Sequence, residues 1–409
     1  MRVLIISKEG DALGVAHRLV SEGNDVKLFV RDTRYARSLK GIVPRVSDWH
    51  KHVGSSDLVI TDMVGMGKLS RDFRGVPYIG ANEYVDRVEL DRQTGMELFK
   101  RAGVKVPETL AFPSPRSVEL PGPWRSGWVI KPCGNKDTSK TIVVKEQELW
   151  DRCIGKTPNC SLIVQRIVEG IEVSTEGWFN GSSFATPYNH TFEEKRFLAG
   201  GLGPQTGCMG NVVITADSNR LTKATVEKIS PFLKMTGYRG PFDINCIVNE
   251  SGAYALEATG RMGYDAVEAL AEGLEEPLGD LLFETASGSL RTMPMASGYN
   301  IAVRTSVPPW PFRKPDHSEA GEPVLGIDEK TLPHLFLTDV YREGDRYFCA
   351  AGDNIILKAT ARSTDLRLGQ KKVYRLLEKI ITNGLQYRND IGDRVPGAID
   401  SLRGWGWLT

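Results

Sequence analysis

The sequence predicts a multidomain protein that joins an α/β unit with a parallel sheet to α+β units rich in antiparallel strands. Its 409 residues are enough for two to four packed units rather than one core. The first 85 residues alternate strand and helix patterns, which favours a small parallel sheet with crossover helices. From Gly127 onward the pattern changes to successive strands, which favours a different, mainly antiparallel architecture.

The N-terminal unit reads as a Rossmann-like sheet without its phosphate fingerprint. Strands are predicted at 2–7, 25–30 and 55–62, and a helix over 10–23 that ends at Gly23. The first turn reads SKEGDALG rather than GxGxxG, and the chain contains no GxxxxGK[ST] loop. We therefore expect this sheet to lie on the substrate side of the protein rather than to hold a nucleotide.

The remaining chain divides at proline-rich connectors. A helix is predicted over 89–103, and one more over 368–384, near the C-terminus. The proline-rich stretches at 107–124 and 306–323 read as breaks between units. The expected units are an N-terminal domain at 1–85, a linker helix and connector at 86–118, a small subdomain at 119–185, a central subdomain at 186–300 and a strand-rich C-terminal domain at 301–409.

The amino-acid composition argues against several classes of function. The net charge of +1 gives no reason to expect binding to nucleic acid or to a membrane surface. No apolar run approaches the length of a membrane span, and the N-terminus lacks the pattern of a signal peptide. The six cysteines form no CxxC pair, which argues against a zinc site and favours a reducing compartment. We expect a cytoplasmic monomer or homodimer that acts on small molecules.

Two stretches suggest contacts to a nucleotide. In WVIKPCGNKDTSK an apolar strand ends at Lys131, just before a polar loop that also carries Lys140, so both amines could meet a phosphate. In SLIVQRIVEGIEV, the backbone of residues 165–168 could bond an adenine edge, and Glu172 could accept hydrogen bonds from a ribose. The alternatives are solvated lysines at a strand end and an ordinary strand, turn and exposed glutamate.

The stretch FDINCIVNESGAYALEATGRMG suggests a metal site. Two strands joined by the turn NESG place Asp243 and Glu257 on facing segments. Two carboxylates at the ends of paired strands offer hard oxygen ligands to a cation such as Mg²⁺. Arg261 lies four residues past Glu257 and could bind a phosphate in a fork geometry. The alternative is a surface ion pair between Glu257 and Arg261.

The stretch EEKRFLAGGLGPQTGCMG, residues 193–210, is rich in glycine and begins with Lys195 and Arg196. Its free backbone donors and two cations could wrap an anionic substrate. The alternative is a flexible surface loop.

The order of these stretches resembles the ATP-grasp family, and within it the phosphoribosylamine–glycine ligases. GLGPQTGCMG is similar to that family's GPNTGGMG signature, and EATGRMG to its EFNxRFG metal motif. DRQTGMELFKRAGVKVPET resembles the helix that leads into its ATP-binding region, and QYRNDIG its RxDIG ending. The resemblance implies a Rossmann-like domain in front of an ATP-grasp core of two α+β subdomains, followed by a strand-rich C-terminal domain.

The resemblance also implies a role for each matching residue, with ATP and Mg²⁺ or Mn²⁺ as cofactors. Asp243, Glu257 and Thr259 would surround the metal, with Thr259 in place of the family's asparagine. Arg261 and Lys195 would be catalytic. The ATP-binding residues would be Lys131, Lys140, Gln165, Arg166, Ile167, Val168 and Glu172. The substrate-binding residues would be Arg196, Pro204, Thr206, Gly207, Met209 and Gly210.

The implied activity is the ATP-dependent joining of an amino acid to an amine through an acyl phosphate, with release of ADP and phosphate. Glycine and an amine on a phosphosugar or nucleotide, such as phosphoribosylamine, are the default substrates. The sequence departs from the family on the substrate side, where SKEGDALG replaces GNGGREHA and MGYDAVE replaces the segment FGDPE. Alternatives are an ATP-grasp ligase for dipeptide-like or modified-nucleotide substrates, and a nucleotide-binding relative without catalysis.

Overall fold

The protein was analysed as a computed structural model, which describes residues 1–120, 124, 127–133, 141–313 and 320–409. The N-terminal unit is a four-stranded sheet in the order β2-β1-β3-β4, and every pair in it is parallel. This confirms the predicted parallel sheet. Its elements are β1 (Arg2–Ser7), α1 (Leu13–Ser21), β2 (Asp25–Val30), α2 (His50–Val53), β3 (Leu58–Thr61) and β4 (Tyr78–Ile79).

Two helices, rather than the single predicted one, connect this sheet to the rest of the chain. They are α3 (Glu83–Leu90) and α4 (Arg92–Arg101). Asp91 ends the first helix with an extended backbone, and its side chain accepts hydrogen bonds from the Gln93 and Thr94 amides at the start of the second. Such side-chain capping is the usual way in which a helix begins, and here it breaks the continuous pattern.

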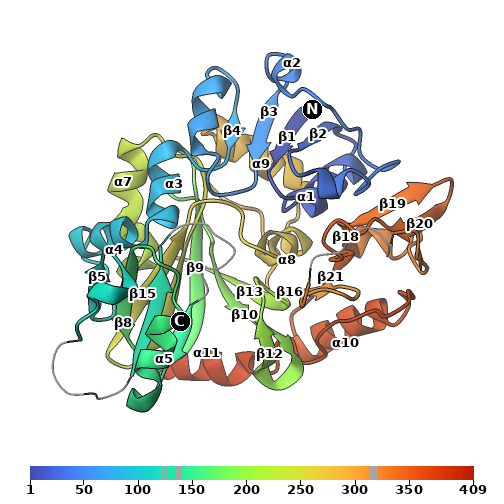
Figure 1. Cartoon of the computed structure of the whole chain (residues 1–409). Coiled ribbons are helices and arrows are strands. Elements are labelled where there is room, and N and C mark those ends of the chain that lie inside the picture. Colours follow the sequence, from blue (N-terminus) through green and yellow to red (C-terminus); the bar gives the residue numbers. More distant parts are fainter. Residues whose placement is uncertain (121–123, 125–126, 134–140, 314–319) are drawn as a thin grey trace.

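A small antiparallel sheet follows in the order β5-β8-β6-β7. Its own apolar core includes the fully buried Trp128, Ile130 and Val164. In Figure 1 this unit forms a separate lobe at the lower left. Its elements are β5 (Thr109–Phe112), β6 (Trp128–Pro132), β7 (Ile142–Val144), α5 (Trp150–Gly155) and β8 (Leu162–Arg166).

The largest layer is an eight-stranded antiparallel sheet in the order β15-β14-β9-β10-β13-β16-β21-β18. It differs from the expected division of the chain at two places. The strand β9, which we expected in the small subdomain, is central to this sheet, and three strands after residue 298 complete its other edge. Its strands are β9 (Ile171–Phe179), β10 (Tyr188–Glu193), β13 (Gly210–Ala216), β14 (Gly240–Asn249), β15 (Gly252–Thr259), β16 (Tyr299–Thr305), β18 (Leu335–Leu337) and β21 (Leu357–Ser363).

Helices and two short sheets cover this layer. The C-terminal α11 was not predicted, because its segment VPGAIDSLRG contains a proline and two glycines, which weaken the helical signal. The helices are α6 (Arg220–Ala224), α7 (Ser230–Met235), α8 (Ala266–Gly273), α9 (Leu278–Ser287), α10 (Leu366–Leu377) and α11 (Val395–Gly404). The short strands are β11 (Arg196–Leu198), β12 (Leu202–Gln205), β17 (Pro323–Val324), β19 (Val340–Glu343) and β20 (Arg346–Cys349).

None of the helices in the described ranges is long and apolar enough to cross a membrane.

Candidate active site

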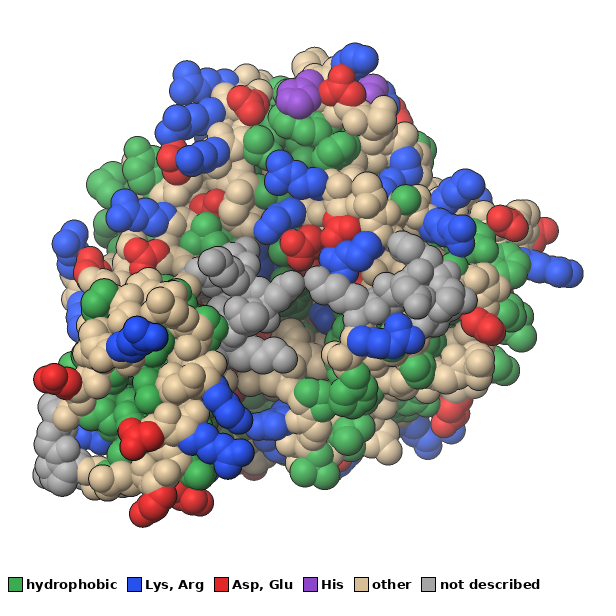
Figure 2. Space-filling view, in the orientation of Figure 1, with side chains coloured by type: hydrophobic (Ala, Val, Ile, Leu, Met, Phe, Trp, Pro, Cys, Tyr) green, Lys and Arg blue, Asp and Glu red, His purple; other side chains and the backbone are tan. Residues whose placement is uncertain are grey.

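A cavity of about 570 Å³ lies where the helices α3 and α4, the large sheet and the β11–β12 hairpin meet. In Figure 2, acidic and basic side chains gather around the hollow near the centre of the face shown. Eight of the residues predicted from the sequence line the cavity: Lys195, Arg196, Thr206, Gly207, Asp243, Glu257, Thr259 and Arg261.

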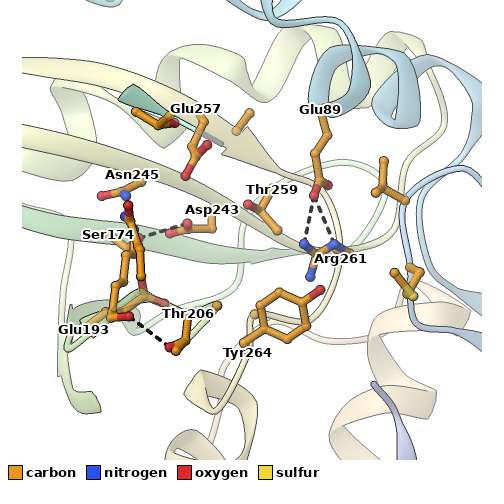
Figure 3. Close-up of a pocket in the computed structure, with 18 of the residues that line it drawn as sticks. Glu89, Ser174, Glu193, Thr206, Asp243, Asn245, Glu257, Thr259, Arg261 and Tyr264 are labelled. Atoms are coloured by element: carbon orange, nitrogen blue, oxygen red, sulfur yellow. Dashed lines mark hydrogen bonds and ion pairs between the residues drawn. The ribbon is translucent and has the colours of Figure 1, made fainter. Parts of the chain in front are cut away.

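The cavity wall is a polar face shared by three neighbouring strands. Asp243 lies opposite Thr259, and Asn245 lies opposite Glu257, in the β14–β15 pair. Side chains two residues apart on a strand share a face, so these four point to the same side of the sheet. Ser174 on β9 joins them from the other side of β14, opposite Asn245. Figure 3 shows this group facing the cavity.

Asp243 carries an oxygen that has no protein partner. Its Oδ2 accepts a hydrogen bond of 3.0 Å from the Ser174 hydroxyl. Its Oδ1 is buried and meets no donor among the described residues. Burial, with Glu176 and Glu193 nearby, raises the pKa of this carboxyl well above its usual range. A buried unsatisfied carboxylate oxygen is costly, so a cation that ligates it would relieve the charge.

Glu257, unlike Asp243, is surrounded by cationic side chains. Arg92 Nη1 is 3.2 Å from its Oε2. Lys131, buried at the end of β6, donates to the backbone oxygen of Leu256 at 3.3 Å. Burial opposes the charge on Glu257, but Arg92, Lys195 and Lys131 outweigh it and hold the Glu257 pKa at about 2. Burial also lowers the pKa of Lys131 to about 8.

Lys195 lies between two carboxylates on adjacent strands. Its Nζ is 2.8 Å from Glu172 and 3.2 Å from Glu193. Asn245 Nδ2 donates to the same Glu172 oxygen at 3.0 Å. Burial disfavours the Lys195 charge, but Glu193 and Glu172 more than compensate and raise its pKa well above the usual value. The amine is therefore a fixed positive charge in the cavity wall.

Arg261 is held on the side of the cavity nearest the N-terminal unit. Its Nε and Nη2 both contact Glu89 Oε1, at 3.0 Å and 2.9 Å. Its guanidinium carbon lies 4.7 Å from the centre of the Tyr264 ring. The alternative of an ion pair between Glu257 and Arg261 is wrong, because Glu257 pairs with Arg92 on α4 and Arg261 pairs with Glu89 on α3. Figure 3 shows the contact between Arg261 and Glu89.

The glycine-rich stretch forms a hairpin rather than an open loop. The strands β11 and β12 pair, and Arg196 Nη1 donates to the backbone oxygen of Gly203. Thr206 donates from its hydroxyl to the Lys195 carbonyl at 2.9 Å, which holds the lysine segment against the cavity. Met209 is fully buried, and a Cβ at Gly210 would lie 2.5 Å from the Ala302 carbonyl oxygen.

Several predicted residues lie outside the cavity lining. Met209 is buried just before β13, Gly210 is the first residue of that strand, and Pro204 is part of β12. Gln165 is buried, and its Nε2 donates to the Thr109 hydroxyl rather than toward the cavity. Lys140 lies outside the described residues. Glu172 contacts the lining residue Lys195, and Lys131 interacts electrostatically with the lining residue Glu257, but neither lines the cavity itself.

Sequence reasoning missed Glu89, Arg92 and Glu193. Two of them stand in ELDR, where opposite charges flank the capping residue Asp91. Their roles depend on the turn between α3 and α4, which directs Glu89 to Arg261 and Arg92 to Glu257. For Glu193 the sequence did contain a signal, because it lies two residues before Lys195 in the motif EEKR. Residues two apart in an extended segment share a face, so the two side chains could be expected to meet.

No protein-family profile matches the chain. Curated relatives do: it is 25% identical over 338 residues to the phosphoribosylamine–glycine ligase of Streptomyces coelicolor, covering 79% of this chain and 80% of that one. It is 24% identical over 342 residues to the ligase of the same name from Leifsonia xyli, covering 78% and 79%.

Solved structures show the same fold. The phosphoribosylamine–glycine ligase of Thermotoga maritima matches with a TM-score of 0.74 at 17% identity, covering 96% of this chain and 100% of that one. The phosphoribosylglycinamide synthetase of Anaerococcus prevotii matches with a TM-score of 0.58 at 13% identity, covering 93% and 98%. The chain thus shares the fold of these solved ligases, and in sequence it is similar to curated phosphoribosylamine–glycine ligases.

Proposed function

We propose that this protein joins an amino acid to an amine through an acyl phosphate made from ATP, with glycine and phosphoribosylamine as the default pair. The observation that carries the proposal is the arrangement of charge in one cavity. Asp243 and Glu257 face it from neighbouring strands, and Lys131, Lys195 and Arg261 supply positive charge around them. A triphosphate with a divalent cation needs both kinds of charge.

The donor set fits Mg²⁺ or Mn²⁺. Magnesium bound to phosphates usually takes one or two protein carboxylates and completes its shell with phosphate oxygens and water. Asp243 Oδ1, which has no donor in the described part of the chain, and the ionised Glu257 provide two such oxygens. Thr259, across from Asp243, can add a hydroxyl. When bound, the cation would neutralise charge on the phosphates during transfer.

The chain's own residues account for the rest of the chemistry. Lys131 and Lys195 hold the phosphates, because both amines lie beside Glu257. Arg261 binds the substrate carboxylate with the planar fork of its guanidinium. The carboxylate oxygen attacks the terminal phosphorus, and ADP leaves. The amine then attacks the acyl carbon and gives up one proton to the phosphate, which leaves with the oxygen that came from the substrate carboxylate. Positioning of this kind supplies most of the catalysis in phosphoryl transfer.

The segment after β8 is proposed to receive the adenine. It links the small sheet to the large one, so it borders both lobes. The amides of Arg166 and Ile167 are bonded to Glu108 and Gly127. Contacts to the base therefore fall to Val168 and to carbonyl groups of this segment. Glu172, at the start of β9, is proposed to accept from the ribose hydroxyls.

A coupled assay of ADP release tests the proposal. The protein is given ATP, Mg²⁺, glycine and phosphoribosylamine, and each component is then omitted in turn. We expect ADP only when a carboxylate and an amine are both present. ADP release that needs neither substrate would overturn the proposal. Turnover with amino acids alone would favour a dipeptide-like ligase, and ATP binding without any turnover would favour a non-catalytic relative.

A further inference from the structure

A second, smaller cavity of about 10 Å³ adjoins the active-site cavity, and both are bordered by Gly263 and Tyr264. It has room for roughly one water-sized group. Acidic residues from three segments line it: Asp11 before α1, Asp62 after β3, and Glu268 on α8.

The start of α1 is closed to anions, because Asp62 already occupies it. The Asp62 carboxylate accepts from the Ala12 amide at 2.9 Å and from the Lys8 amide at 3.3 Å, as well as from the Ser7 hydroxyl. A helix N-terminus usually attracts a phosphate or carboxylate from a ligand. Here the protein's own carboxylate fills that position, so an incoming anion would meet negative charge.

Carboxylates outnumber cations around the small cavity. Asp265 is paired twice, with Arg304 at 2.8 Å and with Lys358 at 3.3 Å, and Lys358 also contacts Glu268. Asp11 and Asp62 form no ion pair with a lysine or arginine of the described chain. Of the charged residues that line the cavity, three are carboxylates, Asp11, Asp62 and Glu268, and one, Lys358, is a cation.

One carboxylate oxygen in this cavity has no partner. Glu268 is 1% exposed, and its Oε2 meets no donor within the described ranges. A buried acceptor without a donor is costly, and a ligand that donates hydrogen bonds would satisfy it. The unsatisfied Glu268 oxygen is an observation separate from the excess of carboxylates, and it also favours a cationic hydrogen-bond donor as the ligand.

Tyr264 places this negative cavity beside the positive charge of Arg261. Its hydroxyl donates to Asp11 Oδ2 at 3.3 Å, and its ring lies under the Arg261 guanidinium at 4.7 Å. Opposite charges thus stand along one aromatic side chain. A small zwitterion has the matching pair of charges.

We propose that the small cavity binds the ammonium group of the amino acid substrate while its carboxylate lies at Arg261. This rests on the proposed function and adds the subsite that selects the substrate. An ammonium group donates three hydrogen bonds, which suits Asp11, Asp62 and Glu268 Oε2. The small volume admits a primary ammonium and leaves no space for methyl groups on the nitrogen.

Substrate analogues test the subsite. The ADP assay is first run with glycine, L-alanine and β-alanine, and the best of them is compared with its N,N-dimethyl and hydroxy-acid analogues. We expect kcat/KM to fall about 10- to 100-fold for both analogues, as for the loss of a charged hydrogen bond. Equal kcat/KM for all three compounds would overturn the subsite and leave the ligase activity intact. ADP release with none of the carboxylates would instead reject the proposed function.

Variants locate the subsite. Asp11→Asn keeps the shape of the side chain and should raise KM for the amino acid about tenfold while KM for ATP stays unchanged. Glu9→Gln is the matched control, because Glu9 lies two residues from Asp11, pairs with the adjacent Lys8 and does not line the cavity. Glu268→Gln provides a second test, with circular dichroism to verify folding. An unchanged KM in both cavity variants would contradict the proposal.

Discussion

Glu257 and Asp11 are carboxylates that border two adjoining cavities, and their surroundings shift their pKa values in opposite directions. At Glu257, nearby Arg92, Lys195 and Lys131 outweigh burial and lower its pKa to about 2. At Asp11, burial and the neighbouring Asp62 raise the pKa to about 7. The first environment keeps a carboxylate charged, as the proposed metal site requires. In the second environment, Arg261 and Lys358 do not offset burial and Asp62, so a bound cation or a proton would stabilise Asp11.

The largest effect is expected at Glu257. Replacing Glu257 with glutamine keeps the size of the side chain and removes its charge, so turnover should fall at least about 100-fold. ADP release at saturating substrates measures this. Glu250→Gln, at the exposed turn of the same β14–β15 hairpin, is the matched control and should behave as wild type. Normal turnover in the Glu257→Gln variant would contradict the proposal that Glu257 is a metal ligand.

The buried ion pairs beside the small cavity are expected to contribute mainly to the stability of the fold. Arg304→Met leaves the fully buried Asp265 with Lys358 as its remaining ion-pair partner in the described chain. Removing one partner from a buried ion pair typically costs about 3–5 kcal/mol of unfolding free energy. Urea unfolding monitored by circular dichroism provides the measurement.

The exposed pair of Arg2 with Asp57 serves as the control for this experiment. Their closest contact is 2.7 Å, but the Arg2 side chain is 58% exposed. Arg2→Met should therefore leave the urea midpoint of unfolding close to that of the wild type. Equal losses for Arg304→Met and Arg2→Met would show that burial does not distinguish the two pairs.

A smaller effect is expected from acid at the contact between the N-terminal unit and the large sheet. Burial, assisted by Arg18, lowers the pKa of His17 to about 4 from the ordinary 6.5. The unfolded chain binds a proton below pH 6.5 while the folded chain does not, so stability falls as the pH drops from 6.5 toward 4. The 2.5-unit difference corresponds to about 3 kcal/mol.

The variant His17→Asn isolates this contribution, because asparagine can still accept from the Leu337 amide that now contacts His17 Nδ1. The variant should lose less stability between pH 7 and pH 4.5 than the wild type. His50→Asn, at an exposed histidine, should retain the full loss. Parallel pH slopes for the wild type and His17→Asn would show that His17 does not titrate in this way.

The two cavities also differ in how far sequence could predict them. Asp243, Glu257 and Thr259 lie on one hairpin, so strand alternation and a short turn suffice to place them together. The small cavity joins Asp11 to Tyr264, 253 positions away, and Glu268 to Lys358, 90 positions away. No local period encodes such contacts, because they depend on how α1, α8 and β21 pack. Only the departures at SKEGDALG and MGYDAVE marked these segments beforehand.

Two local sequence patterns gave wrong secondary structure, because hydrogen bonds that the patterns do not encode decided the structure there. The continuous helical pattern over 89–103 concealed the cap at Asp91, and that cap sets the directions of Glu89 and Arg92. The glycine-rich stretch at 193–210 has the composition of a loop, yet cross-strand pairing makes it a hairpin.

The place of β16, β21 and β18 in the large sheet has a consequence for biosynthesis. These strands follow residue 298, yet they form one edge of the layer whose other edge carries Asp243 and Glu257. A nascent chain halted before residue 357 would leave β16 without β21 and Glu268 without Lys358. The N-terminal parallel sheet can form before the strands of the large sheet have been made, whereas the large sheet must wait until β21 has emerged from the ribosome.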